Sequence, residues 1–72
     1  MEITFIEKEQ IYQEETTRYW FDVDGENFCI SDCNGDITPL NSDGEPIEGP
    51  NQDEIKIIEA ITTEYKKHIM DI

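Results

Sequence analysis

The dipeptide Asp24-Gly25 stands between two runs rich in aromatic and β-branched residues, and it constrains the fold more than any other feature. Asp-Gly suits the left-handed backbone of a two-residue hairpin turn, so it predicts two adjacent antiparallel strands. A two-residue loop also sets the register of the strands that it joins. The predicted cross-strand pairs are Val23 with Glu26, Asp22 with Asn27, Phe21 with Phe28, Trp20 with Cys29, and Tyr19 with Ile30.

This register separates the side chains of the hairpin into an apolar face and a polar face, because successive side chains of a strand alternate. The apolar face is predicted to hold Tyr19, Phe21, Val23, Phe28 and Ile30. Turn chemistry and hydrophobic pattern therefore agree on the same hairpin. Trp20 falls on the opposite, otherwise polar face.

Further strands are predicted on both sides of the hairpin. Residues 3–12 form a first strand, and residues 14–17 (Glu-Glu-Thr-Thr) form the polar connection to a second strand that starts at Arg18. After the hairpin, Asn-Gly at 34–35 and Asp-Gly at 43–44 mark turns around short segments at 37–40 and 46–47. Pro39 and Pro46 lack a backbone N–H, so these last segments are expected to lie near a sheet edge or to be partly loop.

The last third of the chain has the pattern of an amphipathic helix over about residues 51–70. Asn51 suits the N-cap, and Glu54 suits its reciprocal partner in a capping box. The apolar residues recur at spacings of three and four, typical of one helix face. This stripe consists of Ile57, Ile58, Ile61, Tyr65, Ile69 and Ile72. We expect one α+β domain over residues 1–72, in which an antiparallel β-meander of three to five strands (about 2–48) packs against one C-terminal helix.

The sequence favours a cytoplasmic protein. No run approaches the roughly 18 apolar residues of a membrane span, and the first residues lack the pattern of a signal peptide. Cys29 and Cys33 would lie about 13 Å apart in an extended strand, beyond the reach of a disulfide. Reduced thiols fit a reducing compartment.

The residue types indicate no enzyme, no cofactor and no metal. Residues 32–43 match a calcium loop only loosely, because Ile37 stands where that loop requires glycine. Cys29, Cys33 and His68 would supply at most three zinc ligands at a non-standard spacing. His68 has no nucleophile placed beside it by sequence, and a glycine-rich phosphate loop is missing.

The charge of the chain is strongly negative and unevenly distributed. Eighteen Asp and Glu against 5 Lys and Arg give a formal net charge of −13, and residues 19–55 hold ten acids and no Lys or Arg. Such a field repels nucleic acids and anionic membranes. Carboxylates about 7 Å apart along a strand would instead compete with nucleic acid for a basic groove. The alternative is that the acids serve solubility alone.

Trp20 has two interpretations. An aromatic residue ringed by polar groups has the composition of an interface anchor. Equally, Ile6 or Tyr12 of the first strand would cover it in a second small cluster. Tyr12 is itself a second candidate anchor. The candidate partner-binding residues are Asp22, Asp24, Glu26, Trp20, Asp32, Asp36 and Tyr12.

In size, charge and compactness the whole chain resembles the small acidic inhibitors that phages encode against host defences, the anti-CRISPR and DNA-mimic proteins. The resemblance carries no motif and transfers no residue role. It implies stoichiometric binding of a basic nucleic-acid-binding protein or complex in the host cytoplasm, by a monomer or an edge-strand dimer, without contact with nucleic acid or membrane. Two alternatives stay open: an accessory or structural phage or bacterial protein, and an acidic antitoxin that neutralises a basic toxin.

Overall fold

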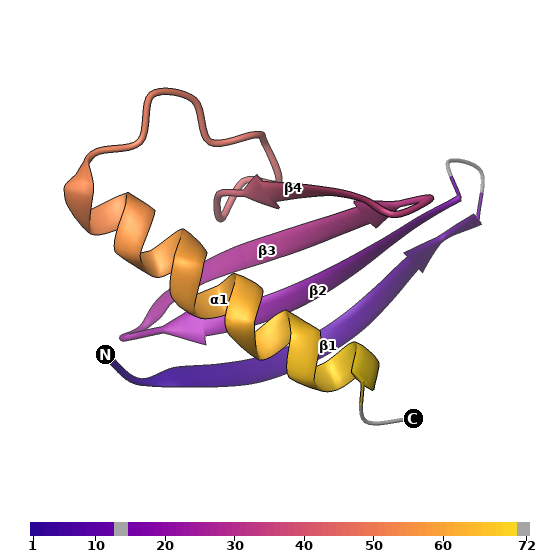
Figure 1. Cartoon of the computed structure of the whole chain (residues 1–72), viewed down its shortest axis with the longest axis horizontal. Helices are drawn as coiled ribbons and strands as arrows, with labels where there is room; N and C mark the ends of the chain where they lie inside the picture. The colour runs from indigo at the N-terminus through magenta and orange to yellow at the C-terminus, as the bar shows by residue number, and fades with distance from the viewer. Residues whose placement is uncertain (13–14, 71–72) are drawn as a thin grey trace.

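The computed structural model describes residues 1–12 and 15–70. Its elements are β1 (Ile3–Ile11), β2 (Thr16–Val23), β3 (Glu26–Cys33), β4 (Asp36–Leu40) and α1 (Gln52–Met70). The strands form one antiparallel sheet in the order β1-β2-β3-β4, and α1 runs diagonally across one face of it (Figure 1). The predicted α+β fold is confirmed. Among the described residues, no helix has both the length and the apolar character needed to cross a membrane.

The β2–β3 hairpin has the predicted turn and register. Asp24 and Gly25 have φ angles of 51° and 89°, as a two-residue turn of this type requires. Asp22 Oδ1 accepts a hydrogen bond of 2.7 Å from Gly25 N. All five predicted cross-strand pairs are present.

The β3–β4 hairpin repeats this turn chemistry, with φ angles of 54° at Asn34 and 94° at Gly35. β4 is a short edge strand that contains Pro39, as predicted. Pro46 makes only an isolated bridge with Leu40, so residues 46–47 belong to a loop and not to a fifth strand.

The polar connection predicted over residues 14–17 is wrong in its second half. β2 begins at Thr16 and not at Arg18, and Thr16 and Thr17 pair with Cys33 and Asp32. Threonine is β-branched and fits a pleated strand, and Thr16 is buried there at 6% exposure. Residue 14 of the connection and Ile72 of the helical stripe lie outside the described residues.

A β-bulge at Ile6 divides β1 into two parts, and the odd-numbered side chains of these parts lie on opposite faces of the sheet. Phe5 pairs with Phe21, but the next pair joins Glu7 to Trp20. The extra residue shifts the alternation by one position. The side chain of Phe5 therefore lies on the helix side of the sheet, whereas those of Glu7 and Glu9 lie on the other side.

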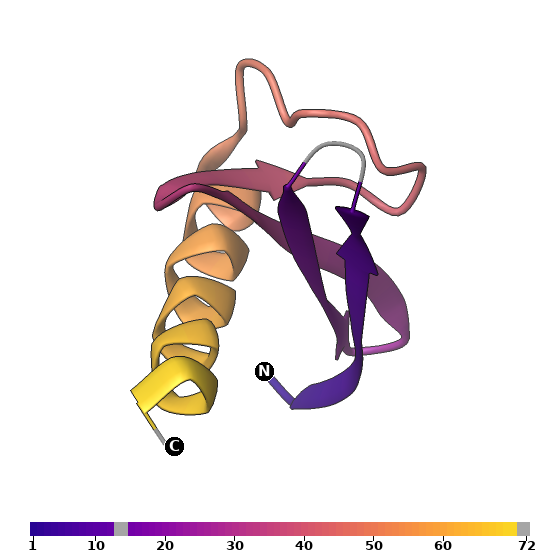
Figure 2. The ribbon, with the colours of Figure 1, turned by 90° about the vertical axis from the view of Figure 1, so that its right-hand side faces the viewer.

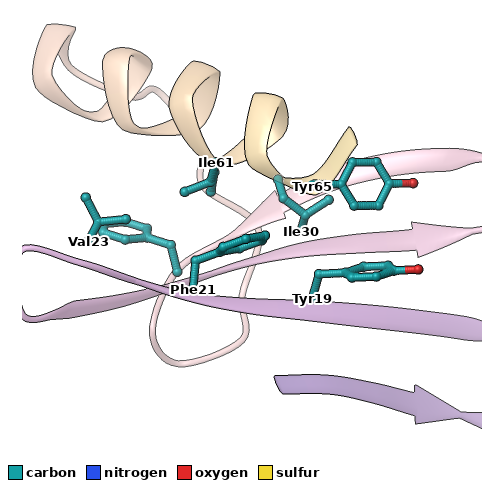
Figure 3. Close-up of a cluster of buried hydrophobic side chains, with 7 residues drawn as sticks. Tyr19, Phe21, Val23, Ile30, Ile61 and Tyr65 are labelled. Carbon is teal, nitrogen blue, oxygen red and sulfur yellow. The ribbon is translucent and has the colours of Figure 1, made fainter. Parts of the chain in front are cut away.

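The core lies between α1 and the β2–β3 hairpin. Figure 3 shows Ile61 and Tyr65 of α1 directed onto the apolar residues of the strands. The rings of Tyr65 and Tyr19 meet edge to face, with centroids 4.9 Å apart. The buried cluster consists of Tyr19, Phe21, Val23, Phe28, Ile30, Ile61 and Tyr65, which confirms the predicted apolar face of the hairpin.

The N-terminus of α1 is held by the predicted capping box. Glu54 N donates to Asn51 Oδ1 at 2.8 Å, and Asn51 N donates to Glu54 Oε1 at 3.2 Å. Two otherwise unpaired backbone donors are thereby satisfied. Beyond the cap, Ile61 joins the buried cluster and Ile57 packs against it.

Candidate protein-binding face

The sheet has one face under α1 and one face without a helix (Figure 2). We call the second the helix-free face. The register assigns to it the side chains of Thr4, Glu7, Glu9, Ile11, Thr16, Arg18, Trp20, Asp22, Asn27, Cys29, Ser31, Cys33, Asp36, Thr38 and Leu40.

The loop after β4 covers part of the helix-free face, and Figure 2 shows it curling to the side away from α1. A methyl group built on Gly44 would lie 3.4 Å from Arg18 Nη1, so the loop passes over the Arg18 guanidinium. Cys29 and Leu40 are buried, at 0% and 5% exposure. The part of this face around Cys29 and Leu40 is therefore closed, whereas Asp36 and Thr38 of β4 are exposed and the β1 side remains accessible.

Trp20 lies between the closed part around Cys29 and the accessible β1 side of this face. Its cross-strand neighbours are Cys29 of β3 and Glu7 of β1, and the ring is partly buried. The indole Nε1 donates to Glu9 Oε1 at 3.4 Å. Ile6 and Tyr12 are 46% and 79% exposed, so neither is buried in a cluster over Trp20. The role of Trp20 as an anchor remains a prediction.

The predicted acidic residues gather at two opposite ends of the sheet. Asp22, Asp24 and Glu26 surround the β2–β3 turn, whereas Asp32 and Asp36 flank the β3–β4 turn (Figure 1). The eight-residue β3 separates these turns by roughly 25 Å. The structure therefore does not bring the five acids into one cluster. Tyr12 follows the end of β1.

Asp32 has a structural role that the sequence analysis missed. Its Oδ2 accepts a hydrogen bond of 2.6 Å from the Tyr65 hydroxyl, and its Oδ1 accepts one of 2.9 Å from Gly35 N. Burial, reinforced by Asp32, raises the pKa of Tyr65 above its ordinary value of 10.0. Asp32 lies on the helix side of the sheet, and its assignment to a partner-binding surface stays a prediction.

The acids at the β2–β3 turn are partly engaged with the backbone. Asp24 Oδ1 accepts from Glu2 N at 2.8 Å, and Asp24 N donates to Glu2 O at 3.0 Å. Glu2, Asp22 and Asp24 line a small cavity of about 230 Å³. A larger one of about 460 Å³ lies near the start of α1 and is lined by Asn41, Glu45, Pro46, Ile47, Glu48 and Glu54. Both cavities carry carboxylates.

Few of the carboxylates are neutralised. Within residues 1–12 and 15–70 the one ion pair joins Lys67 Nζ to Glu64 Oε1 at 3.2 Å, on α1. Lys8 Nζ lies 5.8 Å from the centre of the Tyr19 ring instead of beside an acid. The negative field of the helix-free face therefore acts on solvent and on any partner.

The helix-free face includes one buried thiol, that of Cys29. Cys29 is a free thiol, and burial raises its pKa to about 11. Such a thiol stays protonated at neutral pH and is a poor nucleophile. The part of the chain that the structure describes holds no group of three or more His, Cys, Asp or Glu arranged to bind a metal ion.

The combination of Glu7, Glu9 and Trp20 was missed as a site. Their sequence positions show the spacing of the two acids but not the bulge at Ile6 that turns them onto the face of Trp20.

Comparison of the chain with protein-family models, curated proteins and solved structures gives no match.

Proposed function

We propose that this protein binds a basic nucleic-acid-binding protein or complex and blocks its groove stoichiometrically. The observation that carries the proposal is the acidic surface beside Trp20 on the helix-free face. Glu7 and Glu9 occupy alternate positions of β1 and stand about 7 Å apart. Asp22 follows Trp20 by two positions on β2 and shares the same face.

The charge of this surface suits a partner that normally holds phosphates. Carboxylates at this spacing offer Lys and Arg side chains of a groove an alternative to successive phosphates. The net charge of −13 steers the protein toward a basic surface and repels nucleic acid itself. Binding of this kind weakens as salt concentration rises.

Trp20 adds an apolar contact to the charged surface. Its ring is partly buried, and the hydrogen bond to Glu9 orients it. A restrained aromatic ring loses little conformational entropy on binding, which is why tryptophan is frequent among dominant interface residues. The anchor therefore complements the carboxylates around it.

The resemblance to phage-encoded inhibitors supports a host-defence complex of the CRISPR type as the target, in the cytoplasm of the host. Under the two competing interpretations, the acidity serves only solubility in an accessory or structural protein, or it neutralises a basic toxin. The antitoxin interpretation predicts capture of a toxin, and the solubility interpretation predicts capture of no protein, so one experiment separates the three.

The experiment uses the immobilised protein to capture partners from nuclease-treated bacterial lysate, followed by competition of the captured protein with its nucleic acid. The test variant combines Glu7→Lys with Glu9→Lys. The control combines Glu48→Lys with Glu59→Lys, two exposed acids outside the helix-free face, and changes the net charge equally. We expect the test variant to lose competition and the control to retain it.

Equal behaviour of the two variants would contradict the proposed surface. Capture of a toxin would favour the antitoxin. Capture of nothing from lysates that contain abundant nucleic-acid enzymes would favour the solubility interpretation.

A further inference from the structure

The two edges of the sheet differ in whether they are covered. At the β4 edge, Ile47 N donates to Pro39 O at 3.2 Å, and Pro46 bridges to Leu40. Pro39 itself has no N–H to offer. β1 is nine residues long and pairs only with β2, and no described segment pairs with its outer side. The free edge of the sheet is therefore β1, which Figure 1 shows at the border of the molecule.

The backbone groups that face outward from β1 follow from its pairing with β2. Asp24 N donates to Glu2 O, which marks the first bonded pair of this ladder. In antiparallel pairs every second residue bonds across, and counting along β2 from Asp24 places Glu7 and Glu9 among the β1 residues bonded to β2. Gln10 therefore directs its N–H and C=O away from the sheet.

The regular part of this edge is short and acidic. The bulge at Ile6 interrupts the ladder, so residues 7–11 form its continuous stretch. Glu7 and Glu9 lie on the helix-free face of this stretch, beside Trp20. A bound strand would place its own alternate side chains next to these two carboxylates.

A second copy of the chain is a poor occupant of this edge. Each copy carries a charge of −13. Antiparallel self-pairing centred on Lys8 would place Glu7 directly opposite Glu9 of the other copy, and like charges in directly opposite positions destabilise a sheet. Charge complementarity instead selects a strand with basic residues.

We infer that β1 accepts an extended basic segment of the partner as a fifth strand of the sheet, with Lys or Arg at alternate positions next to Glu7 and Glu9. Main-chain hydrogen bonds along residues 7–11 would provide affinity, and the two carboxylates would select the basic side chains. This inference rests on the proposed function, since a basic partner is its premise, and it specifies how that partner binds.

The first experiment titrates the protein with a synthetic peptide in which Lys alternates with Val, and with the same peptide N-methylated at every backbone nitrogen. The two peptides have equal charge, but the second cannot complete a strand ladder. We expect the first to bind, with the largest amide chemical-shift changes in residues 7–11, and N-methylation to weaken binding by about tenfold or more. Equal affinities, or shifts centred on β4 or α1, would overturn the inference.

The second experiment compares Gln10→Pro with Gln10→Ala. Proline removes the outward N–H without touching the β1–β2 ladder, whereas alanine keeps the N–H. We expect the proline variant to lose at least about tenfold in peptide affinity and the alanine variant to bind as the unmodified protein does. If thermal unfolding shows that the proline variant does not fold, the N-methylated peptide decides with the unmodified protein.

The two proposals fail in different ways. Basic peptides that bind independently of N-methylation, but not to the Glu7→Lys, Glu9→Lys variant, would overturn strand addition and leave the acidic surface standing. Failure of the first peptide to bind, while a captured partner binds, would overturn strand addition alone. If neither the first peptide nor any captured partner binds, both proposals are overturned.

Discussion

The hydroxyl of Tyr65 donates a 2.6 Å hydrogen bond to Asp32 Oδ2 across 33 positions of the chain. The second oxygen of Asp32 accepts from Gly35 N. One carboxylate thus joins the β3–β4 turn to the buried face of α1. Because an acidic residue near a turn has this role, the acids of the chain divide into those that hold the fold and those that remain accessible to a partner.

Tyr65→Phe removes the hydroxyl and keeps the packed ring. We expect the free energy of unfolding to fall by about 2 kcal/mol, because a hydrogen bond to a charged acceptor is lost and the carboxylate remains partly buried. Chemical denaturation measures the loss. Tyr12→Phe is the matched control, since Tyr12 is 79% exposed, and should leave stability unchanged. A similar effect of both variants would show that the hydrogen bond contributes nothing.

Stability is expected to fall at alkaline pH. Burial raises the pKa of Cys29 from 9.0 to about 11 and raises that of Tyr65 above 10.0. The unfolded chain ionises these groups at lower pH than the folded chain does, so their stabilisation is complete below pH 9 and is lost as pH rises from 9 to 11 and above. Urea midpoints at several pH values measure the loss. Cys29→Ala should flatten the dependence between pH 9 and 11, and an unchanged slope would contradict this assignment.

Asn51→Ala tests the capping box at the start of α1. We expect a loss of about 1 kcal/mol, because Glu54 N loses its side-chain acceptor. Gln52→Ala alters the neighbouring exposed residue and should have little effect. Thermal unfolding of both variants provides the comparison, and equal midpoints would mean that packing alone sets the position of the helix.

Charge reversal at the β2–β3 turn should affect folding as well as binding. Asp22 Oδ1 accepts from Gly25 N, and Asp24 has a φ of 51°, a conformation that lysine tolerates poorly. We expect Asp22→Lys or Asp24→Lys to lower stability by about 1 kcal/mol, whereas the exposed Glu26→Lys should leave stability unchanged. Denaturation midpoints distinguish the three. Equal midpoints would contradict a structural role for the turn acids.

Trp20→Ala tests the anchor. The ring is partly buried, so we expect a moderate stability loss of about 1–2 kcal/mol and a loss of partner affinity of about tenfold or more. Tyr12→Ala is the comparison for stability alone, since Tyr12 is 79% exposed but is itself a candidate anchor. A stability loss of about 4 kcal/mol with unchanged affinity of the folded fraction would show that Trp20 is a core residue and not an anchor.

Much of the fold could be predicted because the signals are local. The Asp24-Gly25 turn sets the pairing of its flanking residues, and Asn51 and Glu54 are three positions apart on one helical turn. The start of β2 was predicted two residues too late, because Thr16 and Thr17 are polar by composition and their burial depends on pairing with β3. The bulge at Ile6 has no local signal, since the unpaired residue depends on how Phe5 and Glu7 both find partners on β2.

The sequence by itself determined the β2–β3 hairpin with its register, the turn at residues 34–35, the helix cap and the apolar stripe, because each arises from residues close together in the chain. Tertiary structure alone decided that Asp32 bonds to Tyr65, that the loop after β4 closes one sheet edge, and that Glu7 and Glu9 share a face with Trp20. These relationships join distant segments whose meeting depends on the packing of α1 and on the path of the loop. The negative charge was visible in the sequence, but the surface that it forms was not.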